Sequence, residues 1–290
     1  MPDVEQSTEA SVEQSRREGR YFTRFTPGQR YLHATLFTTF LGLAATGLPI
    51  RFSESAWARA FALGVGGFGT ILFFHKLCAV VLTVAFLLHV KDVLTRGLVH
   101  REKGIFWGPT SMVASWNDVK DLFAHLRWFV GLGPKPAFER YAYWEKFDYW
   151  AVFWGMVVIG FSGYAMWFAP FFAKFLPGWA LNAVLVIHSE EALLAILFIF
   201  SIHFVNTHLR PDSFPMDMVI FTGAESEKEF KAKRSKEYAR LASQGELETR
   251  IATKPATWLV NFTRVIGFTA ILIGLVLLVL TLSAYYTEMI

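Results

Sequence analysis

The sequence predicts an all-α integral membrane protein, made of a four-helix bundle and a fifth transmembrane helix. Three observations predict it. Hydrophobic residues make up 53% of the 290 residues and aromatic residues 17%, and the mean hydropathy is positive. Five apolar stretches reach about 20 residues, the length that crosses a bilayer as a helix. Lys and Arg gather in alternate connections between these stretches.

The five candidate spans differ in composition. They are expected at residues 31–50, 69–94, 147–170, 180–207 and 259–286. The first four carry His, Gly, Ser or Thr, so we expect them to face one another. The fifth contains an uncharged run, 265–282, and we expect it to face lipid.

Positive charge predicts the orientation of the spans. Lys and Arg number five in residues 1–30, nine in 91–146 and nine in 208–258. The connections on the other side hold two in 51–68 and one in 171–179. Cytoplasmic loops carry the excess of Lys and Arg, so we expect the N-terminus in the cytoplasm and the C-terminus on the outer side of the membrane. The net charge of +4 then reflects topology and gives no case for nucleic acid binding.

These boundaries divide the chain into four parts. Residues 1–24 are expected to be a disordered cytoplasmic arm, 25–210 the four-helix domain, 211–257 a charged cytoplasmic segment and 258–290 the fifth span. Within the domain, residues 112–130 repeat apolar side chains every three or four positions, which predicts an amphipathic helix. It is expected on the cytoplasmic membrane surface or, equally, against a soluble partner.

The single cysteine, Cys78, excludes several kinds of site. One thiol forms no intrachain disulfide and builds no cysteine-rich zinc or iron–sulfur centre. The sequence holds no C-x-x-C-H, which excludes covalent c-type haem. Residues 1–30 are polar, so we expect no cleaved signal peptide and a first span that stays in place.

Four histidines carry the functional argument. His75 and His89 are fourteen residues apart in the second span, and His188 and His203 are fifteen apart in the fourth. Each pair spans about 21–22 Å along its helix and stays within about 60° of one face. Because both helices run inward in the predicted topology, the outer two histidines share one depth and the inner two another.

This spacing predicts two stacked b-type haems. Neutral imidazole ligates haem iron, and bundle cores hold such groups. His75 with His188 would hold the outer haem, and His89 with His203 the inner. Ligation also removes the cost of polar rings in a bilayer. A lone membrane histidine is more often a packing residue, but two pairs at matched depth are much harder to obtain by chance.

His33 and His208 lie at the same cytoplasmic end and leave the inner site open. His33 is an alternative to His89 as the partner of His203, or His33 and His208 are ligands of a third haem. Either one is otherwise part of a quinone site or an ordinary interfacial residue.

Other polar residues extend the inner site. Arg30, Asn206 and Arg210 are candidates to bind haem propionates or a quinone carbonyl, besides being ordinary residues at helix ends.

At the outer depth the sequence places Lys76, Glu190 and Glu191 next to ligand histidines. The simpler interpretation is an ion pair between Lys76 and one glutamate. The functional alternative is a proton relay or a contact with a haem propionate. Glycines in the first and third spans would let a porphyrin approach, or would serve helix packing equally well. They are Gly42, Gly47, Gly155, Gly160 and Gly163.

The chain resembles the membrane cytochrome b subunit of formate dehydrogenases, also found in nickel–iron hydrogenases and thiosulfate reductases. The matching stretches are residues 24–48, the His75 region, 143–168, the turn 168–178 and 187–204. The resemblance covers about residues 24–210. It implies four helices that hold two haems b, with electrons passing between a partner on the outer face and a quinone site near the inner haem.

The resemblance assigns His75 and His188 to the outer haem and His33 and His203 to the inner. His89 is a departure from that pattern. The second helix is similar to that of cytochrome b in Rieske-type quinol-oxidising complexes, where both haems use helices two and four.

Together these features predict a quinone-reactive cytochrome b subunit of an oxidoreductase complex, not catalytic alone. It would carry two or three haems b and exchange electrons between menaquinone or ubiquinone and a periplasmic iron–sulfur or multihaem cytochrome c subunit. The outer connections, 18 and 9 residues long, leave no room for an active site. Membrane lipid would surround the spans. The alternative is a haem-free anchor or a proton-conducting transporter subunit, which does not require the matched double spacing.

Overall fold

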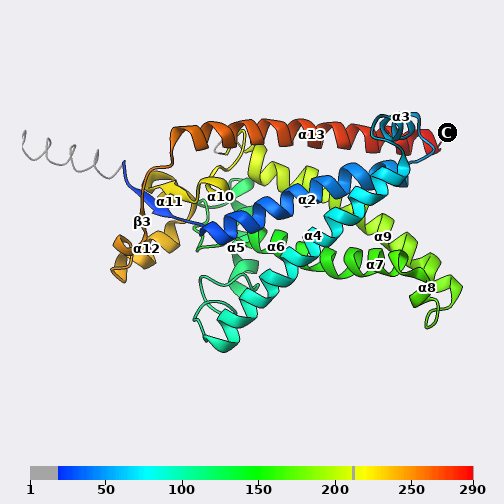
Figure 1. The fold of residues 1–290 in the computed structure, drawn as a ribbon. Helices are drawn as coiled ribbons and strands as arrows, with labels where there is room; N and C mark the ends of the chain where they lie inside the picture. Colours follow the sequence, from blue (N-terminus) through cyan, green and yellow to red (C-terminus); the bar gives the residue numbers. More distant parts are fainter. Residues whose placement is uncertain (1–18, 211–212, 290) are drawn as a thin grey trace, which may run out of the picture. The chain divides into compact units, whose positions relative to one another are not determined.

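A computed structural model describes residues 19–210 and 213–289 (Figure 1). The chain is mostly helical, and five helices are long and apolar enough to cross a membrane. They cover Pro27–Arg51, Phe68–Val99, Tyr143–Trp167, Gly178–Leu209 and Thr257–Tyr286. Each contains most of one predicted span, so the prediction of five membrane-length helices is confirmed.

Three of these spans contain π-helical turns. The first span is α2 (Pro27–Arg51) and the fifth is α13 (Thr257–Met289). The others are composite: α4 (Phe68–Leu94) with η1 (Thr95–Val99); α6 (Tyr143–Gly155), η2 (Met156–Gly160) and α7 (Phe161–Trp167); and α9 (Gly178–Phe198), η3 (Ile199–His203) and η4 (Val205–Leu209). Such turns change which backbone groups pair and are frequent at functional sites. Two short helices join spans, α3 (Ala56–Gly64) and α8 (Ala169–Phe172).

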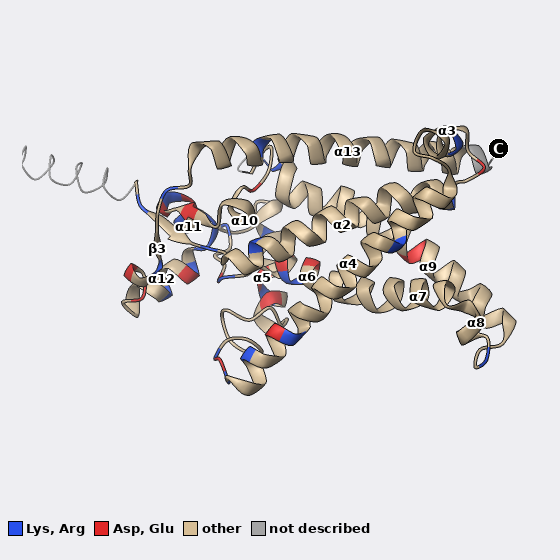
Figure 2. Ribbon diagram, viewed as in Figure 1, with Lys and Arg blue, Asp and Glu red and all other residues tan. Residues whose placement is uncertain are grey.

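The chain folds as two compact units. One, the helical unit, contains Tyr31–Asp92, Trp150–Asp217 and the chain from Thr263 onward. The other, the polar unit, contains the described residues up to Arg30, then Val93–Tyr149 and Met218–Phe262. Figure 2 shows charged residues gathered on α11 and α12 of the polar unit, whereas α13 is nearly free of them.

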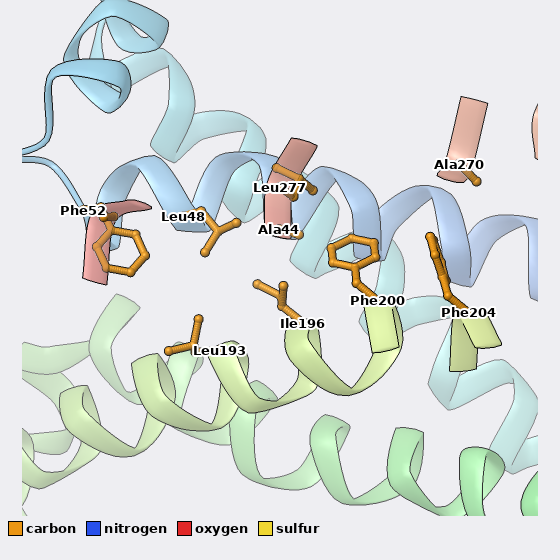
Figure 3. Packing of buried hydrophobic residues seen from close by; sticks show 10 residues of the cluster. Ala44, Leu48, Phe52, Leu193, Ile196, Phe200, Phe204, Ala270 and Leu277 are labelled. Atoms are coloured by element: carbon orange, nitrogen blue, oxygen red, sulfur yellow. The ribbon is translucent and has the colours of Figure 1, made fainter. Parts of the chain in front are cut away.

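The core of the helical unit lies between α2, the fourth span and α13 (Figure 3). Ala44 and Leu48 of α2 are buried with Leu193 and Ile196 of α9. Lipid is as apolar as these side chains, so close packing rather than exclusion of water holds such helices together.

One stripe of α13, made mostly of small residues, is buried. Thr263, Ala270, Leu277 and Ala284 repeat every seven positions and are all buried. A Cβ atom at Gly274 would come within 2.5 Å of the Phe204 ring. The prediction that the fifth span faces lipid is therefore wrong for this stripe, because lack of charge does not show which small residues pack.

The polar unit has a three-stranded sheet with the order β2-β1-β3. The central strand β1 (Tyr21–Thr23) pairs antiparallel with β2 (Ala224–Ser226) and β3 (Ile251–Ala252). Phe22 on β1 is fully buried and packs against Phe230.

This sheet departs from the all-α prediction and from the predicted disordered arm at 1–24. Three residues are too few to show a strand period, and the partners of β1 lie some 200 positions away along the chain. Residues 1–18 of the arm lie outside the described residues.

The predicted charged segment, 211–257, also folds where it is described. Its elements are α10 (Val219–Thr222), β2, α11 (Glu227–Lys233), α12 (Ser235–Ser243), η5 (Glu248–Arg250) and β3.

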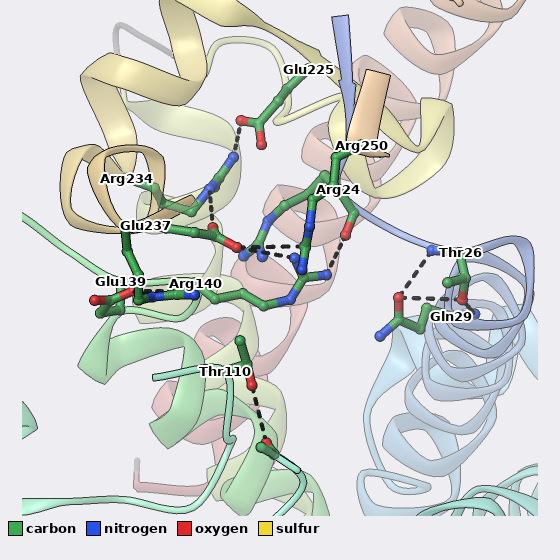
Figure 4. A network of polar contacts seen from close by, with 12 residues as sticks. Arg24, Thr26, Gln29, Thr110, Glu139, Arg140, Glu225, Arg234, Glu237 and Arg250 are labelled. Atoms are coloured by element: carbon green, nitrogen blue, oxygen red, sulfur yellow. Dashed lines mark hydrogen bonds and ion pairs between the residues drawn. The ribbon is translucent and has the colours of Figure 1, made fainter. Parts of the chain in front are cut away.

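Buried charges hold the polar unit together (Figure 4). Glu237 on α12 is 1% exposed. Its Oε1 lies 3.3 Å from Arg140 Nη1 and 3.8 Å from Arg250 Nη1, and its Oε2 lies 3.6 Å from Arg234 Nε. Arg140 also donates to the Arg24 carbonyl at 2.6 Å. These contacts join three segments that are distant in sequence.

The predicted amphipathic helix forms as α5 (Trp116–Phe129). Ser115 and Asp118 cap its first turn, and Lys146 donates to Asp118 at 2.9 Å. Burial alone would raise the pKa of Asp118, but the hydrogen bonds from Lys146 and Ser115 outweigh it and lower that pKa. Trp116 and Phe129 are largely exposed, so α5 has an apolar face without a cover inside the polar unit.

Candidate functional site

The structure brings His75 of α4 and His188 of α9 together. Their ring centres are 6.3 Å apart, and the ring planes meet at 75°. Each ring lies early in its span, as the helical spacing predicts. The pair is the best-defined polar arrangement in the apolar interior of the helical unit.

A hydroxyl determines which nitrogen of His75 carries the proton. Nδ1 of His75 is 2.9 Å from Thr46 Oγ1. The Thr46 hydroxyl already donates its only proton to the Gly42 carbonyl at 2.6 Å. Thr46 must therefore accept from Nδ1–H, which leaves a lone pair on Nε2.

A backbone carbonyl determines which nitrogen of His188 carries the proton. Nδ1 of His188 is 3.0 Å from the carbonyl oxygen of Ile159, which lies in the π-helical turn η2. A carbonyl only accepts, so Nδ1 carries the proton and Nε2 the lone pair. Ser162 Oγ lies 3.3 Å from the same nitrogen and donates to the Val158 carbonyl at 2.6 Å.

Two glycines make room for these imidazole rings. A Cβ atom on Gly47 would lie 3.2 Å from Cε1 of His75, and one on Gly163 would lie 2.9 Å from Cε1 of His188. Of the five glycines expected to admit a porphyrin or another helix, these two admit a histidine ring from a neighbouring helix.

The charged residues near the pair have other partners than the sequence suggested. Lys76 Nζ lies 4.9 Å from the ring centre of Trp167. Glu190 pairs with Arg51 at 3.4 Å, and Trp154 Nε1 donates to Glu191 at 3.4 Å. The predicted ion pair between Lys76 and a glutamate is wrong, because rotation of the helices, not depth alone, decides which side chains meet.

A second histidine group lies further along the spans. His33, His203 and His208 are close enough to interact electrostatically. His208 is buried, and its Nδ1 lies 2.9 Å from the Pro215 carbonyl. His208 therefore also carries its proton on Nδ1. His89 has a ring contact with Phe153, at 6.1 Å between centres.

The other predicted site residues are spread over both units. Arg30 belongs to the polar unit, where its side chain packs along Gly223, a residue in a left-handed conformation with φ of 82°. Asn206 and Arg210 are half-buried in and just after η4.

Sequence reasoning missed three polar side chains. Thr46 and Ser162 contact the ligand candidates, but a hydroxyl within an apolar span carries no spacing signal of its own. His125 of α5 is buried in the polar unit, with Nδ1 3.1 Å from the Tyr143 hydroxyl and its ring stacked on Phe129. Only its position within the amphipathic helix could have indicated it.

No protein-family model matches this chain, and no curated protein matches it significantly.

Proposed function

We propose that this protein is a membrane cytochrome b that exchanges electrons between a quinone and a redox partner, as the quinone-reactive subunit of an oxidoreductase complex. The observation that carries the proposal is the His75–His188 pair. Both rings direct Nδ1–H into a hydrogen bond and keep Nε2 for a metal. Metal-bound histidines commonly donate their other N–H to a carbonyl or similar acceptor.

The geometry of this pair fits a haem. Imidazole rings with centres about 6.3 Å apart would leave room for one metal ion between a nitrogen of each, at metal–nitrogen distances of about 2.0 Å. The observed separation is 6.3 Å. Among the described residues, no three His, Cys, Asp or Glu side chains gather as they would around a bare ion. Haem iron would need only two protein ligands, and His75 and His188 would supply them.

The chain's own residues would tune this site. A bound haem b supplies one-electron exchange between ferrous and ferric iron. His75 and His188 would hold the iron from two different helices, while Thr46 and the Ile159 carbonyl orient the rings. The apolar surroundings lower the local dielectric and so influence the potential.

The second haem belongs at the other histidine group. His203 and His33 lie near each other, which favours His33 over His89 as the inner ligand. His208 has the same protonation pattern as the outer ligands, which supports its role at an additional haem or at the quinone. Asn206 and Arg210, in the same unit, are the candidate donors to a quinone carbonyl or a propionate.

Replacing the inner histidines one at a time distinguishes these ligands. His33→Ala is expected to lose one haem, because His203 loses its partner on the iron. His89→Ala is expected to keep its haem content, because His33 and His203 would hold the inner iron in this assignment. The number of haems per polypeptide and the reduced spectrum are measured for both variants. Loss in His89→Ala with retention in His33→Ala would reverse the assignment.

The proposal includes a place in the membrane. The positive-inside pattern gives a bacterial inner-membrane protein with its N-terminus in the cytoplasm and its C-terminus in the periplasm. The exposed face of α5 then lies on lipid at the cytoplasmic surface. The short connections at the opposite end leave the redox chemistry there to a periplasmic iron–sulfur or multihaem cytochrome c subunit.

The test of the proposed function is the number of haems per polypeptide, measured by pyridine haemochrome on the purified protein. We expect two, with a reduced spectrum of the b type. Three would add His208 to the ligands. A colourless protein would overturn the proposal and favour a haem-free anchor or a proton-conducting transporter subunit.

A further inference from the structure

The two outer histidines differ in what accepts their Nδ1 proton. For His188 the shorter contact is a backbone carbonyl, Ile159 O at 3.0 Å, against 3.3 Å to Ser162 Oγ. His75 has a side-chain acceptor, Thr46 Oγ1 at 2.9 Å, in addition to the backbone carbonyl of Leu43. No substitution removes a carbonyl, but the Thr46 hydroxyl can be removed.

The Thr46 hydroxyl is oriented to accept a hydrogen bond from His75. Its side chain is β-branched and stiff at χ1. Oγ1 lies 2.6 Å from the Gly42 carbonyl and 3.2 Å from the Leu43 carbonyl, both in its own helix. The hydroxyl proton is thereby directed to the backbone and the oxygen lone pairs toward His75. Gly47, the next residue, lies against Cε1 of the same ring. Neighbouring positions of α2 therefore position two edges of one imidazole.

We propose that Thr46 is a positioning residue that keeps His75 in its Nδ1–H form, aims Nε2 at the iron and lowers the midpoint potential of the outer haem. An N–H that donates to an oxygen makes the imidazole a stronger electron donor through its other nitrogen. A stronger donor stabilises ferric over ferrous iron. This inference rests on the proposed function, because it requires a haem on His75.

The test is Thr46→Val, which keeps the branched shape and removes the acceptor. We expect both haems to be retained, because the Leu43 carbonyl remains as an acceptor for His75. One midpoint potential in a redox titration should move to a higher value while the other stays. The low-temperature spectrum of that haem should change with it, and Thr46→Ser should restore both.

The matched control is Thr39→Val. Thr39 is buried in the same helix, and its hydroxyl donates to the Thr35 carbonyl at 2.7 Å, the same kind of bond as in Thr46. We expect both of its midpoint potentials to equal those of the unmodified protein. A shift of the same size in Thr39→Val would attribute the effect to general packing and overturn the inference.

The remaining outcomes are also decisive. Unchanged potentials in Thr46→Val would overturn the role of Thr46 and leave the proposed function intact. Loss of one haem in Thr46→Val supports the role of Thr46 if Thr46→Ser retains that haem. If Thr46→Ser loses it as well, the role of Thr46 is contradicted. Absence of haem from the unmodified protein would be a failure of the proposed function itself.

Discussion

The haem content of the purified protein is expected to fall from two groups per polypeptide to one when His188 is replaced by Ala. His188 supplies one of the two imidazole rings whose centres lie 6.3 Å apart. Without it, His75 is left as a single axial ligand in an apolar interior. The second histidine group lies elsewhere along the spans and shares no side chain with this pair, so its haem should remain. Pyridine haemochrome and the reduced spectrum measure the loss.

The control for this variant is His100→Ala. His100 is an exposed histidine of the polar unit, and its removal should leave the haem content at two. To separate loss of a ligand from loss of the fold, His188→Gly can be prepared with imidazole in the medium. A free imidazole in the vacated space should restore the second haem. Full haem content in His188→Ala would show that His188 is not a ligand.

The helices and the outer histidine pair are the part of this molecule that could be predicted from sequence. A membrane span is a run of about 20 apolar residues, and such runs can be read off the sequence directly. Depth follows from position along a helix, so His75 and His188 could be placed at one level once both helices were given a direction. Neither step requires knowledge of long-range contacts.

The remainder depends on helix rotation and on backbone geometry. Thr46 faces His75 only because α2 turns that side toward α4, and depth does not determine rotation. The Ile159 carbonyl accepts from His188 at a π-helical turn, which no residue type marks. The pairing of Lys76 with Trp167 instead of a glutamate, and of His203 with the His33 side of the bundle, has the same origin.

The polar unit could not be predicted for a different reason. Strand β1 is three residues long, and its partners come from residues 224–226 and 251–252. The charges of α11 and α12 resemble a solvated run in the sequence. In the structure, some of them, Glu237 above all, are buried in a network, and burial of charge is determined by tertiary contacts alone.

Replacing Glu237 is expected to have the largest effect on the stability of the polar unit. Glu237 is 1% exposed and faces the guanidinium groups of Arg140, Arg234 and Arg250. Burial, and then the charge of Arg140, lower the pKa of Arg250 even with Glu237 present. Glu237→Gln keeps the shape and removes a negative charge that lies near all three guanidinium groups. Breaking a buried ion pair in this way costs about 3–5 kcal/mol.

The measurement is the rate at which a protease cleaves the detergent-solubilised protein between residues 218 and 262. This rate reports unfolding of the polar unit. Cleavage should be much faster in Glu237→Gln. The haem content should be unchanged, because His75 and His188 belong to the other unit. Glu248→Gln is the matched control: its pair with Arg20, at 2.5 Å, has a carboxylate 69% exposed, and such surface pairs contribute at most about 1 kcal/mol. Equal cleavage rates in the two variants would mean that the buried network does not stabilise the unit, since burial is what distinguishes the two glutamates.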